Sequence, residues 1–281
     1  MFDIYKGFNS MSNEMSVINL MTSNVQNATT PGFKAGDLNF QEMMDNGVGL
    51  GAFREGNTTT FTQGNVRKTG NALDLAIKEG PSGVACTTFF VLSDGQRTRY
   101  TRGGHFDFKE GKLVDPFSHL NVQGYLLDEN GNKKSDKLET IQLPYDPETK
   151  LYGGTYSGFR FGEGGRLLGE VHINDPLTHQ EVTKTVPIYQ VGLASFTDPG
   201  ALAQDGPTTY QATEASGKPQ CGVAGEDFMA AQVESQHLEM SNVDLPSMYQ
   251  SMIVAKMVYD AQMSAFKAMT KMTETATSLV K

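Results

Sequence analysis

Residues 246–281 read PSMYQSMIVAKMVYDAQMSAFKAMTKMTETATSLVK, and no other part of the chain constrains its fold more strongly. The apolar side chains recur at alternating spacings of four and three residues, which predicts one long α-helix. Pro246 suits the first helical turn, and Asp244 stands just upstream as a candidate cap. At about 1.5 Å per residue the helix would span about 50 Å, more than a small domain needs.

Two heptad-spaced seams run in parallel along this stretch. The first contains Met248, Met252, Ala255, Tyr259, Gln262, Phe266, Met269, Thr273 and Ala276. The second contains Val254, Val258, Ala261, Ala265, Ala268 and Met272, with Leu279 further on. Because two adjacent seams cover more than one face, we expect the helix to have more than one helical neighbour. In the alternative, a hairpin of the two end helices within a monomer, the second seam would stay exposed as an aggregation hazard.

The N-terminal segment carries a seam of the same kind. Its positions are spaced alternately by four and three residues, and all but Thr22 are apolar: Ile4, Phe8, Met11, Met15, Ile18, Thr22 and Val25. This pattern predicts a helix. The helix should end in the segment 27–32, because Thr30 precedes a proline and is pushed out of the α region, and Gly32 permits a turn.

All fourteen methionines of the 281-residue chain lie at these two ends, between Met1 and Met44 and between Met229 and Met272. Methionine is flexible and polarizable, and it packs surfaces that must fit more than one neighbour. The distribution is therefore typical of a subunit that is packed by copies of itself.

The middle of the chain, from about Asn57 to Phe196, alternates short strand-like runs with turns. Period-2 patterning or a buried apolar run is found at 58–62, 73–77, 87–92, 99–102 and 105–108. Turn signals separate these runs, for example Gly103-Gly104 and the stretch 129–132. The spacing predicts an antiparallel β domain of sandwich or barrel type. A Tyr- and Gly-rich stretch at 138–168 could form a small β excursion.

Composition excludes several classes of function. The net charge of −9 argues against a nucleic-acid binder or a binder of anionic membranes. No run of about 18 apolar residues is present, so no membrane span is expected. The N-terminus has neither a basic nor an apolar signal region, so no cleavable signal peptide is expected. Cys86 and Cys221 lack any metal-ligand spacing and are interpreted as two separate thiols; a disulfide would require an oxidising compartment.

No catalytic site, metal site or cofactor is predicted. The five histidines share no metal-ligand spacing, and neither a nucleophile elbow nor a phosphate-binding loop occurs. The segment 128–132 departs from a calcium loop in the position of its glycine and is better explained as a hairpin turn.

Three stretches resemble one family. Residues 23–34, SNVQNATTPGFK, resemble the ANNIANxxTxGFK signature of bacterial flagellar rod and hook proteins. Residues 70–77, GNALDLAI, followed by 100–106, YTRGGHF, resemble its GNxLDxAI…YTRxGxF pattern. Residues 238–245, LEMSNVDL, resemble its LExSNVDL motif. The residues that carry the resemblance are Asn24, Asn27, Thr30, Gly32, Phe33, Lys34, Leu73, Asp74, Tyr100, Arg102, Ser241, Asn242, Val243 and Asp244.

The resemblance implies an α+β fold with paired long N- and C-terminal coiled-coil helices and a central antiparallel all-β domain. The expected boundaries are a terminal helical domain at 1–34 and 235–281, an extended or linker region at 35–56, and the β domain at 57–234. The terminal helices of such proteins line the inner tube of a helical assembly. The implied inner-tube interface comprises Ile4, Phe8, Met11, Met15, Ile18, Val25, Met248, Met252, Val254, Ala255, Val258, Tyr259, Phe266, Met269 and Met272.

The resemblance further implies a non-enzymatic axial subunit of the flagellar basal body. Its partners would be copies of itself, other rod and hook proteins, and the type III export apparatus that exports it without cleavage. We expect a rod protein that encloses the export channel and transmits torque from the motor to the hook. A short hook protein is the alternative, since 122–126 is similar to hook proteins. A secreted oligomeric β-domain adhesin represents a different class. The stretch 78–86 departs from the Gly-Asp-Gly that often follows the LDxAI strand.

Overall fold

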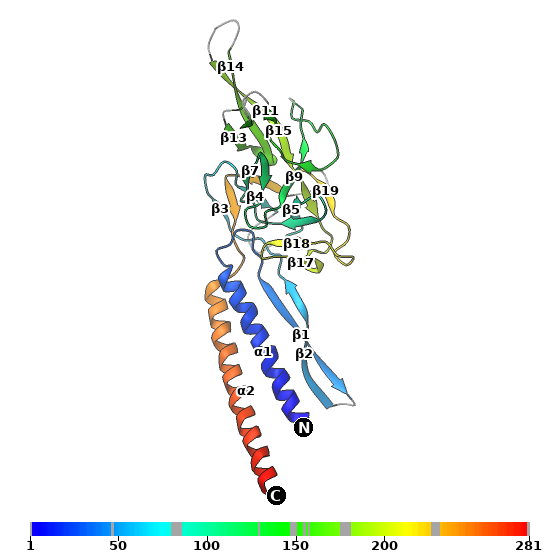
Figure 1. Ribbon diagram of the computed structural model, residues 1–281, viewed down its shortest axis with the longest axis vertical. Coiled ribbons are helices and arrows are strands. Elements are labelled where there is room, and N and C mark those ends of the chain that lie inside the picture. The colour runs from blue at the N-terminus through cyan, green and yellow to red at the C-terminus, as the bar shows by residue number, and fades with distance from the viewer. Residues whose placement is uncertain are drawn as a thin grey trace. The chain divides into compact units, whose positions relative to one another are not determined.

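The structure is a computed structural model, drawn as a ribbon in Figure 1. It describes residues 2–45, 48–79, 86–128, 130–146, 151–153, 156, 158–174, 181–225 and 231–279. The chain divides into two compact units. The helical unit comprises Met1–Ala28, Ala35–Thr60 and Val243–Lys281, and the β unit comprises Thr29–Lys34 and Phe61–Asn242.

The helical unit contains α1 (Phe2–Gln26), α2 (Leu245–Leu279) and a hairpin of β1 (Gly36–Asp45) and β2 (Val48–Thr59). Both predicted helices are confirmed. The two helices pack against each other and α1 also contacts the hairpin. Ser10 on α1 accepts a hydrogen bond from Gln262 on α2, so the helices run antiparallel. Coiled-coil packing of this pair stays a prediction.

The β1–β2 hairpin lies in the segment that the sequence analysis describes only as an extended or linker region. Its strands pair antiparallel from Gly36 opposite Thr59 to Asp45 opposite Val48, with two register irregularities. The glycines and polar residues between 45 and 56 break the period-2 pattern, so the pairing could not be recognised from alternation alone. The structure therefore adds a strand pair to the helical unit.

The β unit consists of short strands, and all the strand pairs described in it are antiparallel, as predicted. Its strands are β3 (Val66–Lys68), β4 (Leu75–Lys78), β5 (Thr88–Ser93), β6 (Thr98–Thr101), β7 (Asp107–Lys109), β8 (Lys112–Val114), β9 (Asn121–Leu126), β10 (Glu139–Thr140), β11 (Tyr145–Asp146), β12 (Leu151–Tyr152), β13 (Gly158–Phe161), β14 (Arg166–Asn174), β15 (Glu181–Val191), β16 (Leu193–Ser195), β17 (Ala203–Gln204), β18 (Thr209–Gln211), β19 (Gln220–Gly222), β20 (Gln232–Ser235) and β21 (His237–Glu239). Two short 3-10 turns, Glu163–Gly165 and Pro199–Ala201, connect some of them.

Thirteen strands form one sheet, whose main path is β13-β14-β15-β9-β5-β6-β18-β17. Strands β7, β8, β10, β16 and β19 attach to this path at its sides. Two separate pairs, β20 with β4 and β21 with β3, bring the last strands before α2 next to the first strands of the unit. These pairs therefore connect the beginning of the β unit with its end, which are far apart in the sequence.

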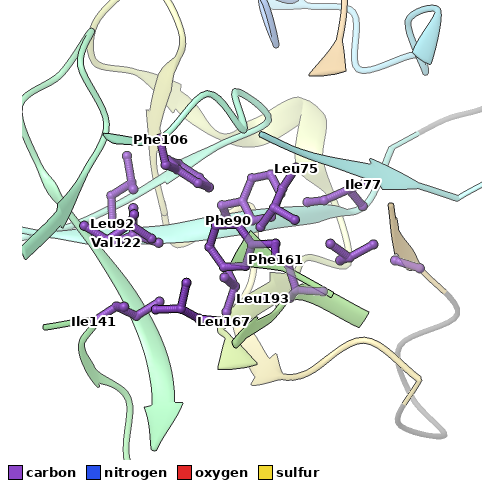
Figure 2. Close-up of a cluster of buried hydrophobic side chains, with 14 of the residues drawn as sticks. Leu75, Ile77, Phe90, Leu92, Phe106, Val122, Ile141, Phe161, Leu167 and Leu193 are labelled. Atoms are coloured by element: carbon purple, nitrogen blue, oxygen red, sulfur yellow. The ribbon is translucent and has the colours of Figure 1, made fainter. Parts of the chain in front are cut away.

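Strand β5 separates two hydrophobic clusters. Phe90 and Leu92 face the first cluster, which Figure 2 shows with Leu75, Phe106 and other buried side chains around them. Phe89 and Val91 face a second cluster of mainly aromatic residues. Because successive side chains of a strand point to opposite faces, this strand, whose side chains from Thr88 to Leu92 are all buried, contributes to two cores. Full burial of each such side chain contributes about 1.5–3 kcal/mol, which gives the β unit its stability.

Candidate functional site

Three charged side chains meet inside the β unit. Lys34, Arg102 and Glu239 are each at most 1% exposed. Lys34 Nζ lies 2.6 Å from Glu239 Oε1, and Arg102 Nε lies 2.8 Å from Glu239 Oε2. One carboxylate therefore binds a different cation with each of its two oxygens. The three residues come from three of the stretches that carry the family resemblance.

The remaining donors of Arg102 are also engaged. Its Nη1 donates to Glu79 Oε1 and to the Thr88 carbonyl, both at 2.6 Å. Its Nη2 donates to Gln63 Oε1 and to the Ile77 carbonyl, both at 3.2 Å. Two cations thus face two carboxylates, so the group is neutral as a whole.

Burial determines how this network contributes to stability. Moving ions out of water costs several kcal/mol each, and only complete pairing and hydrogen bonding offset that cost. Burial alone would lower the pKa of Arg102. The negative charges of Glu239 and Glu79 outweigh this effect, so the pKa is raised overall and the guanidinium stays charged. Burial also raises the pKa of the Cys86 thiol, 3.7 Å from Lys34 Nζ, although Arg102 and Lys34 act in the opposite direction. Cys86 therefore stays a neutral thiol.

Two glycines of the motifs allow backbone segments to approach each other closely. Gly32 has φ of +72°, and a Cβ there would lie 2.2 Å from the Gly103 nitrogen. A Cβ on Gly104 would lie 1.8 Å from the Leu75 carbonyl oxygen. The Gly32 N–H donates to the Glu239 carbonyl at 2.8 Å, next to the ion pairs. These positions need glycine because real Cβ atoms do not fit at such distances.

Asp74 links the motif stretch 70–77 to the stretch 100–106. Its carboxylate is 2% exposed and accepts hydrogen bonds from Thr69 Oγ1 at 2.6 Å and Asn71 Nδ2 at 3.0 Å. His105 Nδ1 lies 2.8 Å from the same carboxylate. Leu75, the next residue, is in the first hydrophobic cluster. Asp74 therefore fixes the turn that leads into the core.

The network lies close in sequence to the points at which the chain passes between the units. The chain passes after residues 28, 34, 60 and 242. Within the β unit, Lys34 Nζ donates to the Thr62 carbonyl at 2.6 Å, and Asn242 Nδ2 donates to Thr62 Oγ1 at 2.8 Å. The segments next to three of the four passages are thereby tied together inside the β unit.

The other motif residues lie outside the charged network. Phe33 is buried, and Leu73 packs against the first core cluster. Tyr100 is also buried, which raises its pKa to about 12. In the helical unit, buried Asn24 donates to the Gly36 carbonyl at 2.9 Å and accepts from the Gly36 N–H at 3.0 Å. The remaining motif residues are partly buried or exposed: Asn27, Thr30, Ser241, Val243 and Asp244.

The predicted inner-tube residues divide into two groups on α2. The first seam is at least partly buried within the helical unit, at Met248, Met252, Ala255, Tyr259, Phe266 and Met269. The second seam is exposed, with Val254 60%, Val258 40% and Met272 71% accessible. One copy of the chain therefore covers one seam and leaves the other open.

On α1 the predicted seam is covered unevenly. Met11 is buried and Ile18 and Val25 are partly buried, whereas Phe8 is 59% and Met15 41% exposed. The side chain of Ile4 lies outside the described residues. The assignment of all these residues to an interface between subunits stays a prediction.

The described residues were also compared with the requirements of a metal site, a membrane-spanning helix and a disulfide. Among the described residues, no group of three or more His, Cys, Asp or Glu side chains is arranged to hold a metal ion. Neither α1 nor α2, over the residues described, is long and apolar enough to cross a membrane. Cys86 is buried and Cys221 exposed, and the two are not joined by a disulfide.

Comparison with known proteins identifies relatives of one kind. The flagellar basal-body rod protein FlgG of Bacillus subtilis is 27% identical over 274 residues, covering 90% of this chain and 89% of FlgG. The flagellar hook protein FlgE of Borreliella burgdorferi is 31% identical over 162 residues, covering 50% of this chain and 35% of FlgE. The flagellar hook protein FlgE of Escherichia coli is 33% identical over 173 residues, covering 61% and 39%. No protein-family model matches the chain.

The chain is homologous, at modest identity, to flagellar rod and hook proteins. The resemblance inferred from the motifs is thereby confirmed. The chain spans only about a fifth to two fifths of the length of the hook proteins that it matches, but 89% of the length of the rod protein. The relatives are structural proteins of the flagellum by name, which is consistent with a non-enzymatic chain.

Sequence reasoning missed part of the buried network. Glu239 lies inside the LEMSNVDL stretch, but only the residues after it were singled out, and Glu79 lies in the segment identified as a departure from the family pattern. Gln63 carried no signal at all. A charged residue between the apolar neighbours Leu238 and Met240 of a short strand was the one available sign, because buried charges are rare unless paired.

Proposed function

We propose that this chain is a structural subunit of the flagellar rod, which polymerises helically around the export channel and transmits torque from the motor to the hook. The observation that carries the proposal is the alignment with a rod protein over nine tenths of both chains. Hook proteins match only part of the chain and extend far beyond it. A short hook protein is the second candidate, favoured by the somewhat higher identity of these partial matches.

The two seams of α2 support a polymer. In one copy, the first seam packs within the helical unit and the second, with Val254 and Val258, is open to solvent. Exposed contiguous apolar surface of this kind marks an interaction site. A neighbouring copy would cover it, and coiled-coil packing of α1 and α2 within and between copies would build the inner tube. A contact repeated by one screw operation gives an open filament.

The buried network supports a role under load. A rod that transmits torque must pass force along each subunit's chain, and the network ties together the segments next to three of the four passages between units. Force that arrives along one segment would be shared by Lys34, Glu239 and Thr62 with the other two. Ion pairs without access to water are suited to this, because solvent cannot replace a broken partner.

The proposed partners are copies of this chain, the rod and hook proteins above and below it, and the export apparatus. The proposed location is the part of the basal body that crosses the periplasm. Before assembly, the terminal helices would be only weakly ordered and would fold on binding, which delays polymerisation until after export.

Electron microscopy of basal bodies from a strain with an in-frame deletion of the gene tests the proposal. A rod that stops short supports an axial rod role, and the remaining length locates the subunit. A complete rod without a hook would establish the hook alternative. Intact rods and hooks would contradict both and return the β-domain adhesin to consideration.

A further inference from the structure

A pocket of about 280 Å³ lies in the β unit, where three turns of the chain meet. The turn between β5 and β6 contributes Asp94, the turn between β8 and β9 contributes Phe117, and the turn between β17 and β18 contributes Asp205. Arg99 on β6 also lines the pocket, and its Nε forms an ion pair with Asp205. A concave site of this volume, with one aromatic ring and a few polar groups that converge on it, suits a small ligand.

Each of the three turns is held in shape by its own hydrogen bonds. Asp94 Oδ1 accepts hydrogen bonds from two backbone N–H groups of its turn, at 2.8 and 2.7 Å. Buried Asp115 accepts one from the Phe117 N–H at 3.3 Å. The Asp205 N–H donates to the Thr209 carbonyl at 2.9 Å. The pocket therefore keeps its shape without a ligand, as most ligand sites do.

Phe117 presents its aromatic ring at this pocket. It is 51% exposed, and it is the one large apolar side chain described in the β unit that is strongly exposed. Two residues further on, His119 has a left-handed φ of +59°, which residues other than glycine rarely adopt. The turn that carries the ring is thus fixed in an unusual conformation, and such conformations are concentrated at binding sites.

The charges and the lining of the pocket limit the class of ligand. Two carboxylates and one guanidinium give a net charge of −1, which disfavours phosphates and other anions. A cationic ligand would face Arg99, which already neutralises Asp205. Charged and hydroxyl side chains make up most of the lining, so a fully apolar ligand would leave them without hydrogen bonds. The class that fits is a neutral ligand with many hydroxyl groups and one apolar face.

We propose that this pocket binds a saccharide. One face of a pyranose ring consists of C–H groups, which would pack on the ring of Phe117. The sugar hydroxyls would donate to the carboxylates of Asp94 and Asp205 and accept from Arg99, and hydrogen bonds to charged groups are the strong ones. The inference goes beyond the proposed function and does not depend on it. For a chain that crosses the periplasm, the glycan strands of the cell wall are saccharides within reach.

Isothermal titration calorimetry of the full chain tests the site with two neutral probes, triacetylchitotriose and maltotriose. We expect saturable binding of at least one probe in the millimolar range. Phe117→Ala should weaken it about tenfold, the size expected for the loss of one aromatic contact. Phe117→Tyr keeps the ring and should bind like the original chain. In the matched control, Tyr249→Ala removes an aromatic side chain that is also 51% exposed, but from the helical unit, and should leave binding unchanged.

Two results would overturn the proposal. One is the lack of saturable binding of both probes, and the other is equal binding by the original chain and Phe117→Ala, which would place the binding elsewhere. Urea unfolding shows whether Phe117→Ala keeps the stability of the β unit, as expected for an exposed side chain, so that weaker binding reports on the site. A preference for the N-acetylated probe would support cell-wall glycan as the natural ligand, and equal or better binding of maltotriose would support another sugar. A rod subunit without this site remains a rod subunit, so failure here leaves the proposed function standing.

Discussion

The two units of this chain solve the problem of burial in opposite ways. In the β unit, two hydrophobic clusters are buried, and Phe117 is the one large apolar side chain that is strongly exposed among the described residues. In the helical unit, where side chains are described, Met11 and Ala255 are the only buried apolar residues. Among the side chains described in the helical unit, nine large apolar ones are exposed: Phe8, Met15, Tyr249, Ile253, Val254, Met257, Val258, Met272 and Leu279.

This difference in burial determines which unit is expected to be stable alone. The β unit buries enough apolar surface, and pairs its buried charges fully, to fold without neighbours. Most of the stability of a helix comes from packing of its apolar face, and one copy of this chain provides that packing on only one side. We infer that the β unit is a finished domain, whereas the helical unit is completed by assembly. The predictions below test this distinction between the two units. They are ordered by the expected change in the unfolding free energy of the β unit, from the largest to the smallest.

Glu239→Gln should destabilise the β unit by about 3–5 kcal/mol, because it leaves Lys34 and Arg102 buried without one of their counter-charges. Urea unfolding followed by circular dichroism measures the loss. Glu170→Gln is the matched control, since it removes an exposed pair with Arg160 and should cost less than about 1 kcal/mol. Equal, small effects of both changes would contradict the structural role of the network.

Alkaline pH should destabilise the β unit through its buried tyrosines. The pKa of Tyr100 is raised by burial from 10.0 to about 12 in the folded chain. Its contribution is therefore complete below pH 10 and is lost as the pH rises towards 12, by at most about 3 kcal/mol. Buried Tyr210 shifts in the same direction. Urea unfolding between pH 9 and 12 measures the slope, and Tyr100→Phe should reduce it; an unchanged slope would refute the assignment.

Met252→Asp or Phe266→Asp should change the β-unit unfolding free energy by less than about 0.5 kcal/mol. Each places a charge in the partly buried first seam of α2, so rod assembly and motility should be abolished. Swimming assays and microscopy of basal bodies measure assembly, and Ser264→Asp at an exposed position serves as the control. Normal rods in either variant would be incompatible with the inner-tube assignment.

Hydrogen exchange of the isolated monomer compares the two units without any mutation. Amides of β5 and β6 should exchange slowly, at the cost of global unfolding of the β unit. Amides of α1 and α2 should exchange much faster, because one copy covers only one seam. Strong protection of both helices before assembly would refute the proposal that they become fully ordered only in the polymer.

The two helices, the antiparallel β character of the middle and the resemblance to flagellar rod and hook proteins could all be predicted from the sequence. Each of these depends on local periodicity or on short motifs, which can be recognised without knowing what lies nearby. Tertiary structure decided that Glu239 pairs with Lys34 and Arg102, which are 205 and 137 residues away, and that 36–59 forms a hairpin. It also decided which seam of α2 is covered. These features depend on strand register and on which faces meet, and no local pattern specifies either.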